Sequence, residues 1–123
     1  MVAILIKLVA EYIKSHISWD ERCHFLGSSE KQIEQLPDNV MIRALHELAR
    51  IRHGLGPRNW KPMRSVGPGV REIRIRSRIE FRIIYLASRP DAIYVLHAFR
   101  KTSARTRKHD IDLARKRLRE IDG

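Results

Sequence analysis

The sequence is short of cysteine and of long apolar runs, and each shortage excludes a class of protein. Cys23, the single cysteine, can form neither an internal disulfide nor a thiolate zinc site, so we expect a reducing, cytoplasmic environment. Lys7 and Glu11 interrupt the apolar residues 1–13, which fall short of the roughly 20 residues that span a bilayer. We therefore expect no membrane association, and an amphipathic helix that packs on the domain or forms a dimer contact.

The sequence also lacks the motifs that hold metals, nucleotides or dinucleotides. Gly67-Pro68-Gly69 has the composition of a turn, and no other glycines have the spacing of a phosphate loop. His46 and His53 stand further apart than the adjacent-turn pair typical of a helical zinc site. No serine is marked as a nucleophile. We expect no metal and no cofactor.

Acidic residues are too few to balance the basic ones in the second half of the chain, whereas the first half is neutral. Residues 1–57 carry 7 Lys or Arg and 7 Asp or Glu, whereas residues 58–123 carry 18 and 7, which gives the whole net charge of +11. Basic and apolar residues alternate in this half, as in Arg74, Ile75, Arg76 and again in Phe81-Arg82-Ile83. This pattern predicts a sheet with one apolar face and one cationic face that meets a polyanion, most simply phosphate.

At 123 residues the chain fits one domain, and its periodicity predicts an α+β fold. We expect helices over 2–17, from Ser28-Ser29 (as the cap) to Gln35, from Asp38 to Gly54, and from Asp110 to the end. A short strand is predicted at 24–26. A meander of hairpins is predicted from strands 61–65, 70–77, 80–87 and 92–99, and a basic loop, 100–109, follows it.

The cations of the second half gather at the predicted strands and at the loop that follows them. They are Lys61 and Arg64 on the first strand of the meander, Arg71, Arg74, Arg76 and Arg82 on the middle two, and Arg100, Lys101, Arg105, Arg107 and Lys108 after the last. Arginine holds phosphate with a planar, permanently charged fork. Among these cations, Glu72 is read as a general base or as an ion-pair partner. His97 is read as a core histidine or as a functional one.

Four motifs resemble the HigB-like branch of the RelE/ParE toxin superfamily, whose members are often labelled phage-derived. In order and spacing they are Trp60-Lys61-Pro62-Met63, Gly69-Val70-Arg71-Glu72-Ile73-Arg74-Ile75, Phe81-Arg82-Ile83-Ile84-Tyr85 and Val95-Leu96-His97-Ala98-Phe99-Arg100-Lys101. The segments Phe25-Leu26-Gly27-Ser28-Ser29 and Leu36-Pro37 also match, so the resemblance covers about residues 22–121. Residues 1–18 precede the usual start of the family and form a helical extension to a toxin domain at 19–123.

The resemblance implies helices packed on a twisted antiparallel sheet with a closing helix. It also implies a toxin that cleaves mRNA on the ribosome and that a cognate antitoxin, of helix-turn-helix type, neutralises. The catalytic set implied is Arg82, Arg74 and Lys101, with Glu72 or His97 for proton transfer. The set that binds RNA phosphates is Lys61, Arg64, Arg71, Arg76, Arg100 and Arg105. The closing helix lacks the His or Tyr that some relatives use as acid or base.

Two other functions fit a basic chain of this kind. ParE-like relatives bind and inhibit DNA gyrase without cleaving RNA, and a basic phage accessory protein would bind nucleic acid without toxicity. All three require cations, and only the nuclease requires them to converge on one phosphate. A homodimer through residues 2–17 is a further expectation.

Overall fold

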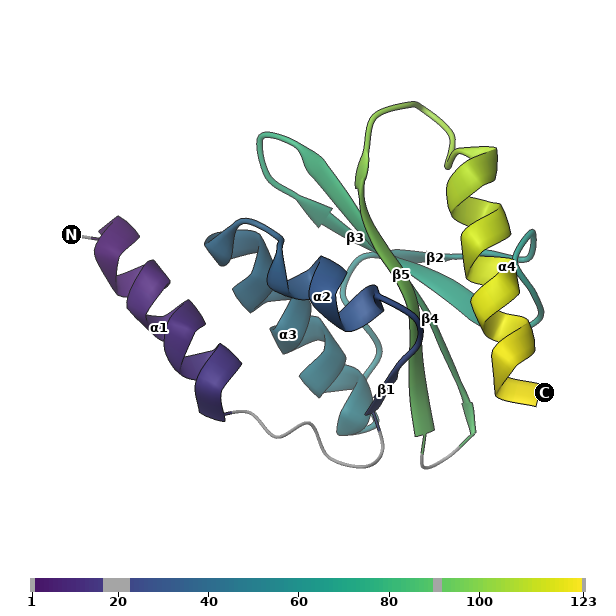
Figure 1. The fold of residues 1–123 in the computed structure, drawn as a ribbon, viewed down its shortest axis with the longest axis horizontal. Helices are drawn as coiled ribbons and strands as arrows, with labels where there is room; N and C mark the ends of the chain where they lie inside the picture. Colours follow the sequence, from purple (N-terminus) through teal and green to yellow (C-terminus); the bar gives the residue numbers. More distant parts are fainter. Residues whose placement is uncertain (1, 17–22, 90–91, 123) are drawn as a thin grey trace.

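The computed structural model describes residues 2–16, 23–89 and 92–122 and has an α+β fold (Figure 1). In chain order its elements are α1 (Val2–His16), β1 (Cys23–Phe25), α2 (Ser29–Glu34), α3 (Asp38–Arg52), β2 (Trp60–Pro62), β3 (Val70–Arg76), β4 (Glu80–Arg89), β5 (Ala92–Lys101) and α4 (Lys108–Asp122). The predicted helices and strands are confirmed in number and order. β2 is shorter than predicted, and α4 begins two residues earlier, at Lys108.

The five strands form one sheet in the order β1-β5-β4-β3-β2. The antiparallel meander from β2 to β5 is confirmed. The prediction of an antiparallel sheet is wrong at one edge, because β1 pairs parallel with β5 and makes the sheet mixed. A three-residue strand carries no signal of its partner, so only the tertiary structure decides this pairing.

The two faces of the sheet have different covers. Helices α2 and α3 lie on one face over an apolar core that includes Ile73, Ile75 and Ile83. On the other face, α4 packs over a second apolar cluster, which includes Val70, Ile84 and Leu96. Figure 1 shows α4 on the opposite side of the sheet from α2 and α3. Side chains alternate between the faces with period two, so β3, β4 and β5 each contribute to both cores.

One predicted helix cap is wrong. Ser28 precedes α2, but its side chain makes no capping hydrogen bond. Its hydroxyl oxygen instead accepts a hydrogen bond from Arg117 Nη2 of α4, at 2.9 Å. The following Ser29 is fully buried, and its hydroxyl donates to the Val95 carbonyl. Both serines therefore tie α2 to its neighbours and do not cap it.

Helix α1 lies against α3 on the side of the molecule away from α4 (Figure 1). This confirms that the helix packs on the domain, yet Val2, Ile4, Leu5 and Leu8 remain exposed. Among the described helices, none combines the length and apolar character needed to cross a membrane.

Candidate functional site

Charged side chains gather on strands β2 to β5, on the same face of the sheet as helix α4. The register sets Arg74 directly opposite Arg82, Arg76 opposite Glu80, and Glu80 opposite Lys101. On the other side of β3, Lys61 pairs with Glu72. Partners that face each other across a sheet point to the same side. We call this group the Arg82 cluster; its members are Lys61, Glu72, Arg74, Arg76, Glu80, Arg82 and Lys101.

Arg82 is held between two carboxylates. Its side chain is 3% exposed; its Nε lies 3.3 Å from Glu72 Oε1, and its Nη2 donates to Glu80 Oε2 at 2.8 Å. Burial lowers the pKa of Arg82, and Glu72 and Glu80 oppose that change. Arginine stays protonated under such conditions. Arg82 shares a face of the sheet with Arg74, as the predicted cationic face requires, although its side chain is enclosed.

Glu72 is the ion-pair partner in this cluster. Its side chain is fully buried, Lys61 Nζ lies 3.6 Å from its Oε1, and the Thr106 hydroxyl donates to its Oε2 at 2.8 Å. Thr106 belongs to the loop that precedes α4, so this contact holds the loop against β3. A carboxylate enclosed in this way has no open side for a substrate hydroxyl.

Glu80 is the carboxylate of the cluster that solvent reaches. Its side chain is 38% exposed, and its Oε1 lies 3.4 Å from Arg76 Nε. It lines an open hollow of about 470 Å³ together with Lys101 and the loop residues 102–104. Desolvation lowers the pKa of Lys101, and the nearby Arg82 and Lys61 lower it further. An exposed carboxylate and a lysine whose pKa is lowered therefore share one hollow.

Four buried side-chain atoms of the Arg82 cluster have no hydrogen-bond partner among the described residues. They are Glu72 Oε1, Arg74 Nε, Arg82 Nε and Arg82 Nη1. Buried polar groups are ordinarily satisfied, because an unpaired one costs about 1–3 kcal/mol. Arg82 Nε and Glu72 Oε1 lie 3.3 Å apart as an ion pair, so what the cluster lacks is an acceptor for Arg74 Nε and Arg82 Nη1. An anion would supply it.

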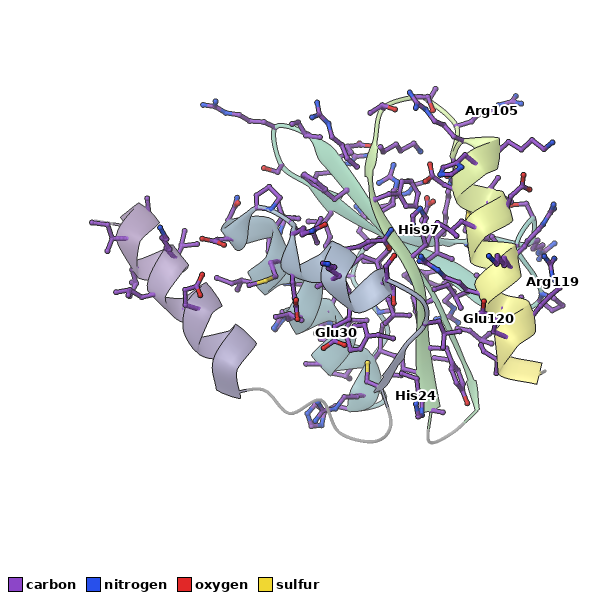
Figure 2. The ribbon with its side chains drawn as sticks, viewed as in Figure 1. His24, Glu30, His97, Arg105, Arg119 and Glu120 are labelled. Atoms are coloured by element: carbon purple, nitrogen blue, oxygen red, sulfur yellow. The ribbon has the colours of Figure 1, made fainter. Side chains whose placement is uncertain are left out.

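Four of the predicted phosphate ligands lie elsewhere. Arg71 is on the face covered by α3, where it stacks over the Trp60 ring at 4.0 Å. Arg100 pairs with Phe81, whose side chain belongs to that same face, although Arg100 also lines the 470 Å³ hollow. Arg64 lies in the turn after β2, and Arg105 in the loop before α4 (Figure 2). Strand alternation puts Arg71 and Arg74 on opposite faces, so the sequence alone could have excluded Arg71 from the Arg82 cluster.

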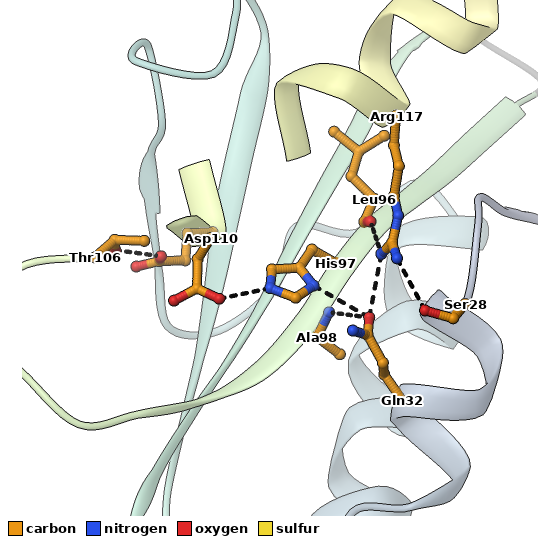
Figure 3. Close-up of polar contacts among 9 residues, drawn as sticks. Ser28, Gln32, Leu96, His97, Ala98, Thr106, Asp110 and Arg117 are labelled. Atoms are coloured by element: carbon orange, nitrogen blue, oxygen red, sulfur yellow. Dashed lines mark hydrogen bonds and ion pairs between the residues drawn. The ribbon is translucent and has the colours of Figure 1, made fainter. Parts of the chain in front are cut away.

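His97 belongs to a second polar cluster, shown in Figure 3. Its Nε2 lies 2.7 Å from Asp110 Oδ1 and its Nδ1 lies 3.1 Å from Gln32 Oε1. Arg117 Nη1 donates to the same glutamine oxygen and, at 2.7 Å, to the Leu96 carbonyl. We call Ser28, Gln32, His97, Asp110 and Arg117 the His97 network. It joins α2, β5 and α4.

Both ring nitrogens of His97 are occupied, and the ring is 3% exposed. Burial lowers the pKa of His97, and the hydrogen bond with Asp110 offsets this only in part. Gly27 leaves room for the network: its φ is +56°, and a Cβ there would come within 2.5 Å of Arg117 Nε. Of the two readings of His97, the structure favours the core histidine.

Sequence reasoning missed Glu80, Thr106 and most of the His97 network. Glu80 had a signal, because it stands two residues before Arg82 in a predicted strand and so shares its face. Thr106, Gln32 and Arg117 had none, since their contacts cross 21 or more residues. No cluster of three metal-ligating side chains was found among the described residues.

Comparison with known families gives one match. Residues 31–119 match the model of the family described as phage derived protein Gp49-like (DUF891). The matched range begins in α2 and ends in α4, so it contains every residue of the Arg82 cluster. No curated protein matches the chain significantly.

Proposed function

The chain belongs to the phage-derived Gp49-like family, and from this premise we propose that it is the toxin of a toxin–antitoxin pair, a HigB-like endoribonuclease that cleaves mRNA on the ribosome. The unsatisfied guanidinium nitrogens of Arg82 and Arg74 carry this proposal. Arg82 and Arg74 stand directly opposite each other in the register, and these nitrogens have no hydrogen-bond acceptor among the described residues; a scissile phosphate would provide one. Dispersed cations would serve a general nucleic-acid binder equally well; convergent ones favour catalysis at one phosphate.

The proposed reaction uses the RNA's own 2′-hydroxyl. Glu80 takes the proton from that hydroxyl, whose oxygen attacks the adjacent phosphorus. The bond from phosphorus to the 5′ oxygen breaks, and the leaving oxygen takes a proton from Lys101. The products are a 2′,3′-cyclic phosphate and a 5′-hydroxyl end. Arg82 and Arg74 stabilise the negative charge that accumulates on the phosphate oxygens.

Glu80 replaces Glu72 and His97 as the proposed base because of access. Glu72 is fully buried and ion-paired, and the nitrogens of His97 are both occupied. Glu80 is exposed, and its contact with Arg82 fixes it beside the proposed phosphate site. Lys101 shares the open hollow with Glu80, and its lowered pKa favours proton donation. Arg82, Arg74 and Lys101 thus keep the roles that the resemblance implied.

The test is to map RNA ends after brief induction of the gene in a bacterial host. We expect new 5′-hydroxyl ends inside translated messages with the wild type, and none with Glu80→Gln. Purified protein added to a translating extract should yield 2′,3′-cyclic phosphate ends. Intact messages together with inhibited DNA supercoiling would contradict the proposal and favour the gyrase inhibitor. Intact messages without growth inhibition would favour a non-toxic nucleic-acid binder.

A further inference from the structure

A second basic hollow lies at the open edge of β3. Strand β2 pairs only with residues 71–73, so beyond Ile73 the edge of β3 has no neighbouring strand among the described residues. The hollow there measures about 270 Å³ and is lined by Arg43, Glu47, Arg58, Asn59, Arg74 and Arg76, among others. The Arg74 amide donates to the Asn59 carbonyl at 2.8 Å, and Arg43 Nη1 donates to the Arg76 carbonyl. Helix α3 thus contributes an arginine to the edge of the sheet.

The charges in this hollow leave a surplus of cations. Four arginines line it with one carboxylate, Glu47. That carboxylate is already engaged: Arg58 donates to it from its backbone nitrogen at 3.0 Å and from Nε at 2.9 Å. Arg74 Nε is buried, with no hydrogen-bond partner in the described part of the chain. The unpaired donor at this hollow is thus the Arg74 Nε that the hollow shares with the Arg82 cluster.

The two basic sites are continuous through shared residues. Arg74 lines the hollow and stands directly opposite Arg82 across β3 and β4. Arg76 also lines the hollow, and its Nε lies 3.4 Å from Glu80 Oε1. An anionic chain that places one phosphate at Arg82 can place a neighbouring one at Arg43 and Arg58 without crossing an uncompensated carboxylate.

We infer that this hollow is a second phosphate subsite, which holds a backbone phosphate of the RNA strand flanking the bond that is cut. The inference rests on the proposed function for the identity of the strand. A guanidinium binds a phosphate through two parallel hydrogen bonds, and the hollow offers several such groups around a small volume. The continuity with Arg82 favours a polynucleotide over an acidic protein segment, because repeated phosphates match both sites at once.

The experiment measures binding of single-stranded DNA oligonucleotides, which carry the phosphates and lack the 2′-hydroxyl that reacts. Fluorescence anisotropy compares a dinucleotide with a ten-nucleotide strand for the wild type, for Arg43→Gln and for Arg43→Gln/Arg58→Gln. Arg119→Ala, an exposed arginine on α4, is the matched control (Figure 2). Thermal melting checks that each variant is folded. The single variant leaves Glu47 paired with Arg58.

For the long strand we expect the double variant to bind on the order of tenfold more weakly. Its plot of log affinity against log salt concentration should be shallower by about 0.7 for each phosphate that the variant no longer neutralises. Dinucleotide binding and the Arg119→Ala control should be unchanged. Arg43→Gln alone should show the same pattern at smaller size.

Two outcomes would overturn the inference. Equal affinity and salt dependence for the wild type and both folded variants would remove the hollow from the RNA path. Loss of binding to an acidic peptide with unchanged oligonucleotide binding would make it a protein-docking surface. Failure of the proposed function would look different. If the protein bound the long strand through Arg43 but cleaved no mRNA, the subsite would stand and the nuclease function would be rejected.

Discussion

Two buried polar clusters lie on the same sheet and differ in how completely their atoms are paired. In the His97 network, no buried side-chain nitrogen or oxygen lacks a partner within the described residues, whereas four such atoms of the Arg82 cluster do. A satisfied network fixes one arrangement of the elements around it. An unsatisfied one keeps capacity for a ligand, at a cost in stability. This difference separates a structural connection between helices from the proposed binding site, although both contain a buried arginine.

The largest effect should come from breaking the buried ion pair of the Arg82 cluster. Glu72→Gln leaves the enclosed Arg82 without its inner carboxylate, and removing one partner of a buried pair costs about 3–5 kcal/mol. Urea denaturation measures the free energy of unfolding. Asp110→Asn is the counterpart in the His97 network, and we expect a loss of about 1–3 kcal/mol there. A Glu72→Gln protein as stable as the wild type would show that the pair contributes nothing to folding.

The same substitution in the two clusters should separate catalysis from folding. Arg82→Lys removes the planar fork from the proposed phosphate site, and we expect cleavage to slow by about 10²-fold or more. Arg117→Lys breaks hydrogen bonds with Ser28, Gln32 and Leu96, and it should lower the melting temperature while the folded fraction keeps its rate. Single-turnover cleavage, scaled to the folded fraction, measures both. An equal loss of cleavage rate in the two variants would contradict the assignment of catalysis to the Arg82 cluster and of folding to the His97 network.

Acid should weaken the His97 network before it affects the Arg82 cluster. The folded-state pKa of His97 lies below 6.5, mainly because of burial, while the unfolded chain takes up this proton near 6.5. Between the two values the unfolded state binds more protons, so the free energy of unfolding falls as the pH falls. Asp110, His109 and Arg117 of α4 are the charged or titratable groups around the ring. We expect His97→Gln to flatten this part of the stability profile between about pH 7.5 and 5.5, and an unchanged profile would contradict it.

Deleting residues 1–18 should have the smallest effect on either cluster. Helix α1 touches α3 and leaves Val2, Ile4 and Leu5 exposed, so it forms an apolar surface outside the sheet. We expect a modest fall in melting temperature or a change in the mass in solution, with RNA binding retained. Light scattering and thermal melting together measure this. An identical mass and melting temperature would make the segment dispensable for both.

The sequence predicted the elements well because their signals are local. Strand β3 and the start of β4 follow an alternation of basic and apolar residues, and α3 follows a helical spacing that buries Met41, Leu45 and Leu48. The limits of β2 and the start of α4 were missed by one to three residues, since frayed ends carry weak signals. The parallel pairing of β1 had no local signal at all.

For the candidate site, the sequence alone determined which residues could share a face, because strand alternation is a property of neighbours along the chain. It placed Arg82 with Arg74 and kept both away from Phe81. Only the tertiary structure decided which of these cations are paired, buried or open. Contacts such as Thr106 with Glu72 and Arg43 with Arg76 join residues far apart in the chain, and packing fixes them. Charge and periodicity therefore set the cationic face, and the fold decides where on that face an anion finds unpaired donors.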